Sequence, residues 1–183
     1  VVNVTPYAAG LPNALKNQML GKAQQANIQR KTADPTHPVA LNVGDRVQTI
    51  VQARVLPDAL GVLLRSGERY QVTVEPYLYW QDESIMCTAN GWHVEDPLVE
   101  EQLSGMLSQL KKTVIRAGRS GRVIPNLDWF TLVLCFDEEP DEEKLHYQVT
   151  THSPTEFVAE SDGKLYAFAN DYKSFFVDQY SNN

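Results

Sequence analysis

The chain has 183 residues, which corresponds to one compact domain, since domains usually contain about 100–200 residues. Hydrophobic residues make up 43% of the chain and charged residues 21%, which are ordinary globular values that exclude a wholly disordered protein. The net charge of −7 disfavours non-specific binding to nucleic acid or to an anionic membrane. No apolar stretch approaches the roughly 18 residues that a membrane-spanning helix needs.

The N-terminal part of the chain is predicted to form a helical arm. Four apolar residues in a segment rich in Ala, Gln and Asn recur with the spacing of one helix face: Leu11, Leu15, Met19 and Ala23. Two prolines within residues 34–38 end this helix, because the residue before a proline disfavours the helical conformation. We therefore expect residues 1–38 to be an arm or linker, docked elsewhere or on a partner, and residues 39–183 to be the domain.

From Val39 onward the sequence is typical of β-strands. Several segments alternate apolar and polar residues, or are short apolar runs bounded by Gly, Pro, Asn and Asp. The expected strands are residues 46–55, 60–64, 68–75, 112–117, 129–136, 145–150, 156–159 and 164–169. This spacing predicts an all-β sandwich rather than alternating βαβ units. One helix is expected to interrupt the strands from Asp96 and Pro97, which suit the N-cap and the first helical position.

The sequence contains no motif that identifies an enzyme, and we expect a non-catalytic protein. It has no GxSxG elbow, no Walker loop and no HExxH motif, and its four histidines do not fall at metal-ligand spacing. The acidic run 137–143 lacks the glycine of a typical calcium loop and is predicted to be a solvated loop. Cys87 and Cys135 are expected to be buried small hydrophobes, which would pair only if their strands were adjacent.

Aromatic residues beside a carboxylate point to a binding surface. Tyr79 and Trp80 follow a predicted strand, with Asp82 two positions beyond Trp80 and Trp92 further along the chain. Sugar rings stack on aromatic faces, and sugar hydroxyls need planar donors and acceptors, so this combination is typical of carbohydrate-binding sites. The alternative is that these large rings close one end of the sandwich core.

Several segments, taken in order, resemble the small galactophilic bacterial lectins of the PA-IL type and the lectin-like domains related to them. Residues 163–171 and 180–183 resemble the end of that pattern, in which a strand leads into Asn-Asp and then into Tyr-x-Asn-Asn. Earlier parts of the pattern are similar to residues 58–70, 80–82, 90–92 and 128–132. The resemblance extends over residues 41–183 and leaves the predicted arm outside it.

The resemblance implies a jelly-roll-like, galactose-binding-like β-sandwich with a calcium ion that coordinates sugar hydroxyls. Calcium prefers several oxygen ligands, which carboxylates, amides and main-chain carbonyls all supply. By position in the pattern, Asp171 is the anionic ligand, Asn182 and Asn183 are the amide ligands, and the carbonyl of Trp80 is a main-chain ligand. An alignment without a gap places Asp178 and Gln179 at the two amide positions instead. With the aromatic cluster, the predicted ligand-binding residues are Asn170, Asp171, Tyr79, Trp80, Asp82 and Asn182.

The sequence therefore predicts a non-catalytic, calcium-assisted carbohydrate-binding domain. A first alternative is a protein–protein assembly module with a degenerate sugar site, as a homo-oligomer or within a larger assembly, because the arm and the lack of the family's last strand suggest completion by a partner. A second alternative is the accessory domain of a longer lipase-like hydrolase. The sequence identifies neither the sugar nor the compartment, so extracellular and cytoplasmic locations both stay open.

Overall fold

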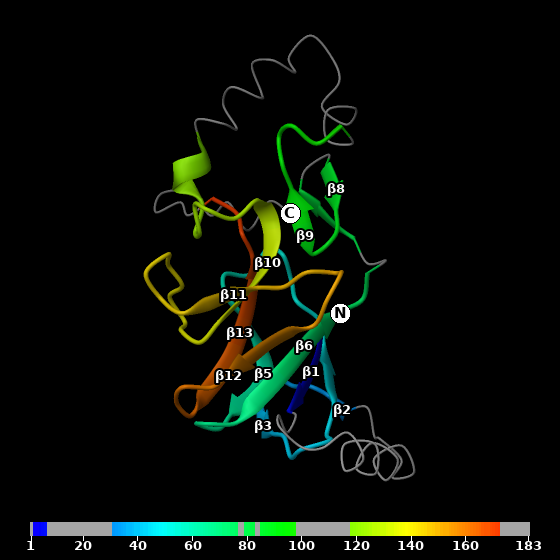
Figure 1. The fold of residues 1–183 in the computed structure, drawn as a ribbon, viewed down its shortest axis with the longest axis vertical. Helices are drawn as coiled ribbons and strands as arrows, with labels where there is room; N and C mark the ends of the chain where they lie inside the picture. The colour runs from blue at the N-terminus through cyan, green and yellow to red at the C-terminus, as the bar shows by residue number, and fades with distance from the viewer. Residues whose placement is uncertain (1, 7–30, 77–78, 83–84, 98–117, 173–183) are drawn as a thin grey trace.

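The computed structural model shows an all-β protein with two main sheets and a small separate hairpin (Figure 1). It describes residues 2–6, 31–76, 79–82, 85–97 and 118–172. A short 3-10 helix, η1 (Gly118–Gly121), lies between the strands. The predicted helical arm over residues 11–30 and the inserted helix beyond Pro97 lie outside the described residues.

The first sheet has five strands in the order β12-β6-β1-β4-β2. They are β1 (Val2–Pro6), β2 (Lys31–Thr32), β4 (Val47–Thr49), β6 (Arg69–Val74) and β12 (Thr155–Val158). The strand β1 lies between β6 and β4 and is antiparallel to both, with Val4 opposite Val72 and Val47. The sequence analysis assigns residues 2–6 to the arm, but the structure makes them a central strand, because Val2 and Val4 alternate with polar residues and are both buried.

The second sheet has six strands, with the path β11-β10-β13-β5-β3 and with β9 also paired to β10. They are β3 (Val39–Ala40), β5 (Asp58–Leu64), β9 (Asn90–Trp92), β10 (Trp129–Cys135), β11 (His146–Gln148) and β13 (Gly163–Ala169). The separate hairpin consists of β7 (Trp80–Asp82) and β8 (Ile85–Cys87). Every strand expected within the described residues overlaps an observed one, although the expected strand 46–55 is observed only as β4.

The two sheets share one hydrophobic core, so the architecture is an open two-sheet sandwich. Alternate residues of each sheet point into this core. The first sheet contributes Val2, Val4, Val47, Tyr70, Val72 and Phe157. The second sheet contributes Leu60, Val62, Leu64, Leu132, Leu134, Leu165 and Ala167. Burying each large apolar side chain contributes about 1.5–3 kcal/mol, so these residues supply most of the stabilisation of the fold.

The outer face of the second sheet is buried as well. The strands β10 and β13 are apolar on both faces, and their outward side chains pack against residues 122–128, which we call the cover segment. The contacting side chains are Val133, Cys135, Tyr166 and Phe168 from the sheet and Val123, Ile124 and Leu127 from the cover segment. Burial on both faces explains why residues 129–135 form an almost continuous apolar run.

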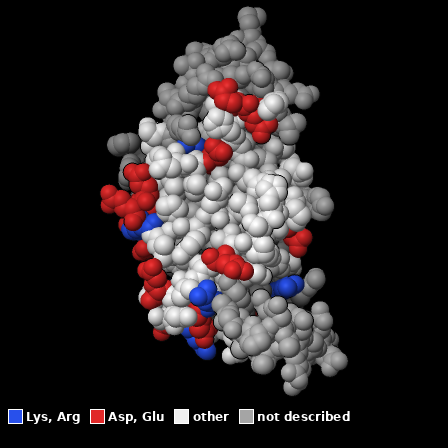
Figure 2. Space-filling view, viewed as in Figure 1, with Lys and Arg blue, Asp and Glu red and all other residues white. Residues whose placement is uncertain are grey.

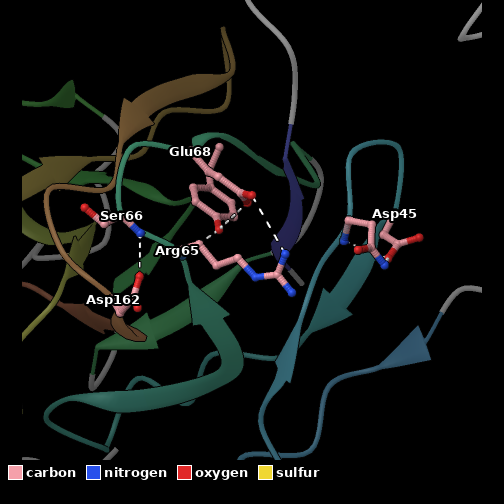
Figure 3. A network of polar contacts seen from close by, with 7 residues as sticks. Asp45, Arg65, Ser66, Glu68 and Asp162 are labelled. Atoms are coloured by element: carbon pink, nitrogen blue, oxygen red, sulfur yellow. Dashed lines mark hydrogen bonds and ion pairs between the residues drawn. The ribbon is translucent and has the colours of Figure 1, made fainter.

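Two turns that cross between the sheets are tied together at one end of the sandwich (Figure 3). Ser66, in the turn between β5 and β6, donates its N–H to Asp162 Oδ1 at 2.7 Å and its hydroxyl to Glu160 O at 3.0 Å. Both acceptors lie in the turn between β12 and β13. These bonds tie the two sheets to each other at this end, because each turn connects one sheet to the other.

Candidate functional site

The end of the sandwich beside the β7–β8 hairpin contains packed aromatic rings, and we call it the aromatic end. Trp92 and Trp129 stack with ring centroids 5.9 Å apart, and Trp80 meets Phe130 edge-on at 6.3 Å. The indole N–H of Trp80 donates to Thr88 O at 3.0 Å. Most of these rings therefore close the core, which is the structural alternative that the sequence left open.

Tyr79 is the exception among these rings. Its side chain is 60% exposed, whereas Trp92 is 5% exposed and Trp80 is half-buried. Because Tyr79 immediately precedes Trp80 at the start of β7, the hairpin holds its ring at the surface of the aromatic end. Tyr79 is thus the more exposed of the two predicted ligand-binding aromatic residues, and its ring has surface available for stacking.

Asp171 lies at the same end of the molecule as Trp80. Phe130, whose ring contacts Trp80, donates its N–H to Asn170 O at 2.9 Å, so residues 170 and 171 lie beside the start of β10. The carboxylate Oδ1 of Asp171 accepts the N–H of Tyr172 at 2.7 Å. Trp80 and Asp171, which are 91 positions apart in the sequence, therefore lie at one end of the molecule.

Asn170 is fully buried and its amide is engaged by backbone atoms of the cover segment. Its Oδ1 accepts the N–H of Ile124 at 2.9 Å. Its Nδ2 donates to the carbonyls of Ile124, Leu127 and Asp128 at 2.9, 3.3 and 3.1 Å. A ligand would have to displace these bonds to reach the amide, and the role that the structure assigns to Asn170 is to fix the cover segment to the end of β13.

Arg122 also lies at this end of the sandwich. It is buried, and its guanidinium lies 5.1 Å from the centroid of the Trp129 ring, a cation–π contact. Its Nη2 also donates to Pro125 O within the cover segment. The basic residues around residues 118–122 are the only sequence signal, and they do not reveal burial against a tryptophan that follows seven positions later.

The described residues do not by themselves complete a calcium shell. Calcium takes roughly six to eight oxygen ligands. Of the implied set, Asp171 contributes the one described carboxylate, while Asn182 and Asn183, with the alternative pair Asp178 and Gln179, lie outside the described residues. The side chain of Asp82 is likewise not described, although its backbone pairs with that of Ile85. Within the described ranges, no three His, Cys, Asp or Glu side chains are grouped so that they would hold a metal ion.

Both cysteines are buried and free, as the sequence analysis predicts. Cys87 packs in the cluster of the aromatic end, whereas Cys135 faces the cover segment. Burial raises the pKa of the Cys135 thiol to about 12, because the thiolate would lose its hydration there. Cys135 therefore stays protonated near neutral pH and serves as a small core residue.

Asp58 is a buried carboxyl at the start of β5, with 8% of its surface exposed. Its Oδ2 accepts the N–H of Gln52 at 2.8 Å. Burial raises the pKa of Asp58 above its ordinary value of 3.8, because the loss of hydration of the carboxylate outweighs that one hydrogen bond.

We expect Asp58→Asn to stabilise the protein at neutral pH, because the amide oxygen still accepts the Gln52 N–H without a buried charge. A raised folded-state pKa means that the folded protein holds the proton more tightly than the unfolded chain. Relative to the variant, the wild type should therefore lose stability as the pH rises above 3.8 and through the folded-state pKa. Urea unfolding at about pH 3.5 and about pH 7 measures this, and a wild-type advantage that grows with pH would contradict it.

Comparison with protein-family models, curated proteins and solved structures finds no match to this chain. The class that the fold defines is therefore an open all-β sandwich with an aromatic end, and its function has to be argued from its own residues. Within the described residues, the structure contains no helix with the length and apolar character needed to span a membrane.

Proposed function

We propose that this chain is a non-catalytic carbohydrate-binding domain of the galactose-binding-like, jelly-roll-like sandwich class. The observation that carries the proposal is the exposed ring of Tyr79 at the same end of the sandwich as the Asp171 carboxylate. An aromatic face stacks on the C–H face of a sugar, and a carboxylate accepts hydrogen bonds from sugar hydroxyls. The packed rings of Trp92 and Trp129 at the same end give this part of the molecule a firm scaffold.

Calcium enters the proposal through Asp171 and the C-terminal amides. Asp171, Asn182 and Asn183 would hold the ion together with the carbonyl of Trp80, and the bound ion would coordinate sugar hydroxyls. In this arrangement Asp171 supplies the negative charge, and the neutral ligands leave part of the coordination shell open to the sugar.

Isothermal titration calorimetry with galactose, mannose, glucose and N-acetylglucosamine tests this proposal. We expect a calcium-dependent part of the heat of binding, and this part is lost when EDTA is added. Asp171→Asn should weaken binding by about tenfold or more, since a charge-assisted bond contributes about 1.5–3 kcal/mol. The matched control is Asp45→Asn, a loop carboxylate that accepts the N–H of Asn42. Absence of heat with all four sugars, or equal affinities for the two variants, would refute the proposal.

A second candidate function is a protein assembly module, and the open edges of the sheets favour it. The outermost described strands, β12 and β2 in one sheet and β11 and β3 in the other, each pair with one neighbour. Such an edge pairs readily with a strand of another chain. Size-exclusion chromatography with light scattering distinguishes this candidate. A single monomer mass at all concentrations would exclude self-assembly, and a discrete oligomer would support it.

A further inference from the structure

A hollow of about 440 Å³ lies beside the loop between β10 and β11, on the outer side of the second sheet. Figure 2 shows acidic side chains gathered along this edge of the molecule. The polar residues that line the hollow are Asp137, Glu138, Glu139, Lys144, Lys164 and Tyr166. The sequence predicts a solvated acidic loop here, but the structure shows that half of the loop forms one wall of a concave surface.

The β13 strand supplies the floor of the hollow. Tyr166 lies opposite Cys135 in the sheet, with its ring buried and its hydroxyl donating to Glu138 Oε1 at 2.7 Å. Burial, reinforced by the hydrogen bond to Glu138, raises the pKa of Tyr166 to about 12, so the phenol stays a donor. Lys164 lies two residues earlier on the same face of the strand. The floor thus has a fixed position relative to the loop.

The loop wall is held by its own bonds. Lys144 Nζ donates to Glu139 O at 2.6 Å, and Asp141 Oδ1 accepts the backbone N–H groups of Glu143 and Lys144 at 2.9 and 3.2 Å. These contacts close the loop on itself, although it carries six acidic residues between positions 137 and 143. These bonds give the loop beside the hollow a defined shape.

Two lysine–carboxylate pairs face the hollow without hydrogen-bonding directly. Lys144 Nζ lies 3.9 Å from Asp137 Oδ1, and Lys164 Nζ lies 3.9 Å from Glu138 Oε1. Hydrogen bonds between such groups are normally about 2.7–3.2 Å long, so each pair leaves a donor and an acceptor spaced apart. A hydroxyl group satisfies both at once, because it accepts from the ammonium and donates to the carboxylate.

We infer that this hollow binds a neutral sugar through its hydroxyl groups, independently of any metal ion. Sugar hydroxyls fit both members of each pair, because a hydroxyl accepts from the ammonium and donates to the carboxylate, whereas a ligand group of one charge sign pairs with only one member. The volume accommodates a monosaccharide unit, and two pairs, one within the loop and one between the loop and β13, match a ligand with several hydroxyls. The inference goes beyond the proposed function, because the hollow shares no residue with the aromatic end.

The test is an NMR titration of the isotope-labelled chain in EDTA, with galactose, mannose and glucose and with their methyl glycosides. We expect saturable shifts of the backbone amide signals of residues 137–139, 141–144 and 164–166. Shifts with the free sugars alone would identify a free monosaccharide as the ligand, and shifts with the methyl glycosides as well would identify a glycan terminus. No shift of these signals with any of the six probes would overturn the inference.

Single substitutions distinguish sugar binding in the hollow from sugar binding at the aromatic end. Glu138→Gln keeps an acceptor for Tyr166 but removes the charge, and it should weaken binding by about tenfold or more. Lys164→Gln should weaken it similarly. The matched control is Glu142→Gln, which lies in the same loop outside the hollow and should bind as the wild type does. Equal affinity of Glu138→Gln and Glu142→Gln would overturn the inference, as would binding that requires calcium and depends only on Asp171.

Discussion

Asn170→Ala is expected to lower the free energy of unfolding by about 3–4 kcal/mol. The substitution removes the acceptor for the Ile124 N–H and the donor for three backbone carbonyls of the cover segment. These groups lie where water does not easily replace the amide, because Asn170 is fully buried. Urea unfolding followed by tryptophan fluorescence measures the loss.

The matched control for this prediction is Asn126→Ala. Asn126 belongs to the same cover segment but is exposed, so its truncation should change the stability by no more than about 0.5 kcal/mol. Similar losses for the two alanine variants would show that the amide of Asn170 does not hold the cover segment. A loss restricted to Asn170→Ala would identify this side chain as the connection between β13 and the outer layer.

Gly91→Ala is expected to destabilise the protein by about 4 kcal/mol or more. Gly91 has a φ of +76°, and an added Cβ would lie 2.3 Å from Trp129 O and 2.5 Å from Thr131 N. Those atoms belong to the backbone of β10, an interior strand that pairs with β9, β11 and β13, so they cannot move aside cheaply. Urea unfolding gives the loss of stability, and near-ultraviolet circular dichroism reports the stack of Trp92 and Trp129.

Gly67→Ala is the control that separates backbone strain from steric overlap. Gly67 has a similar φ of +80°, but an added Cβ would meet no atom within 4 Å. Its loss should therefore be limited to the cost of the left-handed conformation, about 1–2 kcal/mol. If both alanine variants lost the same stability, close approach of β9 to β10 would not be the reason for glycine at position 91.

The strands that the sequence predicts well are those whose local pattern is unambiguous. The apolar runs of β10 and β13 and the alternation in β6 identify strands without reference to their neighbours. The pattern fails after Thr49, because the alternation continues to residue 55 while the chain turns and leaves Ile50 68% exposed. The strand β1 is missed because its partners, β4 and β6, begin more than 40 residues further along the chain.

The candidate sites also differ in how much of each can be predicted from the sequence. The motif around Trp80 and the Asn170–Asp171 pair lead to two segments that the structure does bring to one end. The hydrogen bonds of the Asn170 amide cannot be predicted from the sequence, because its partners are backbone atoms of a segment 46 positions away. The sequence does not predict the hollow. A run of acidic residues predicts a loop whose side chains repel one another, and only the fold brings Lys164, far along the chain, beside Glu138.

The way the cover segment is fastened makes its opening measurable. The N–H of Ile124 is held by the side chain of Asn170, and the N–H of Val123 by the carbonyl of Asp171 at 3.1 Å. Neither amide hydrogen exchanges with deuterium from the solvent until the segment separates from the end of β13. The exchange rates of these two hydrogens therefore measure how often the cover segment separates from the second sheet. A ligand that binds Asp171 should lower both exchange rates.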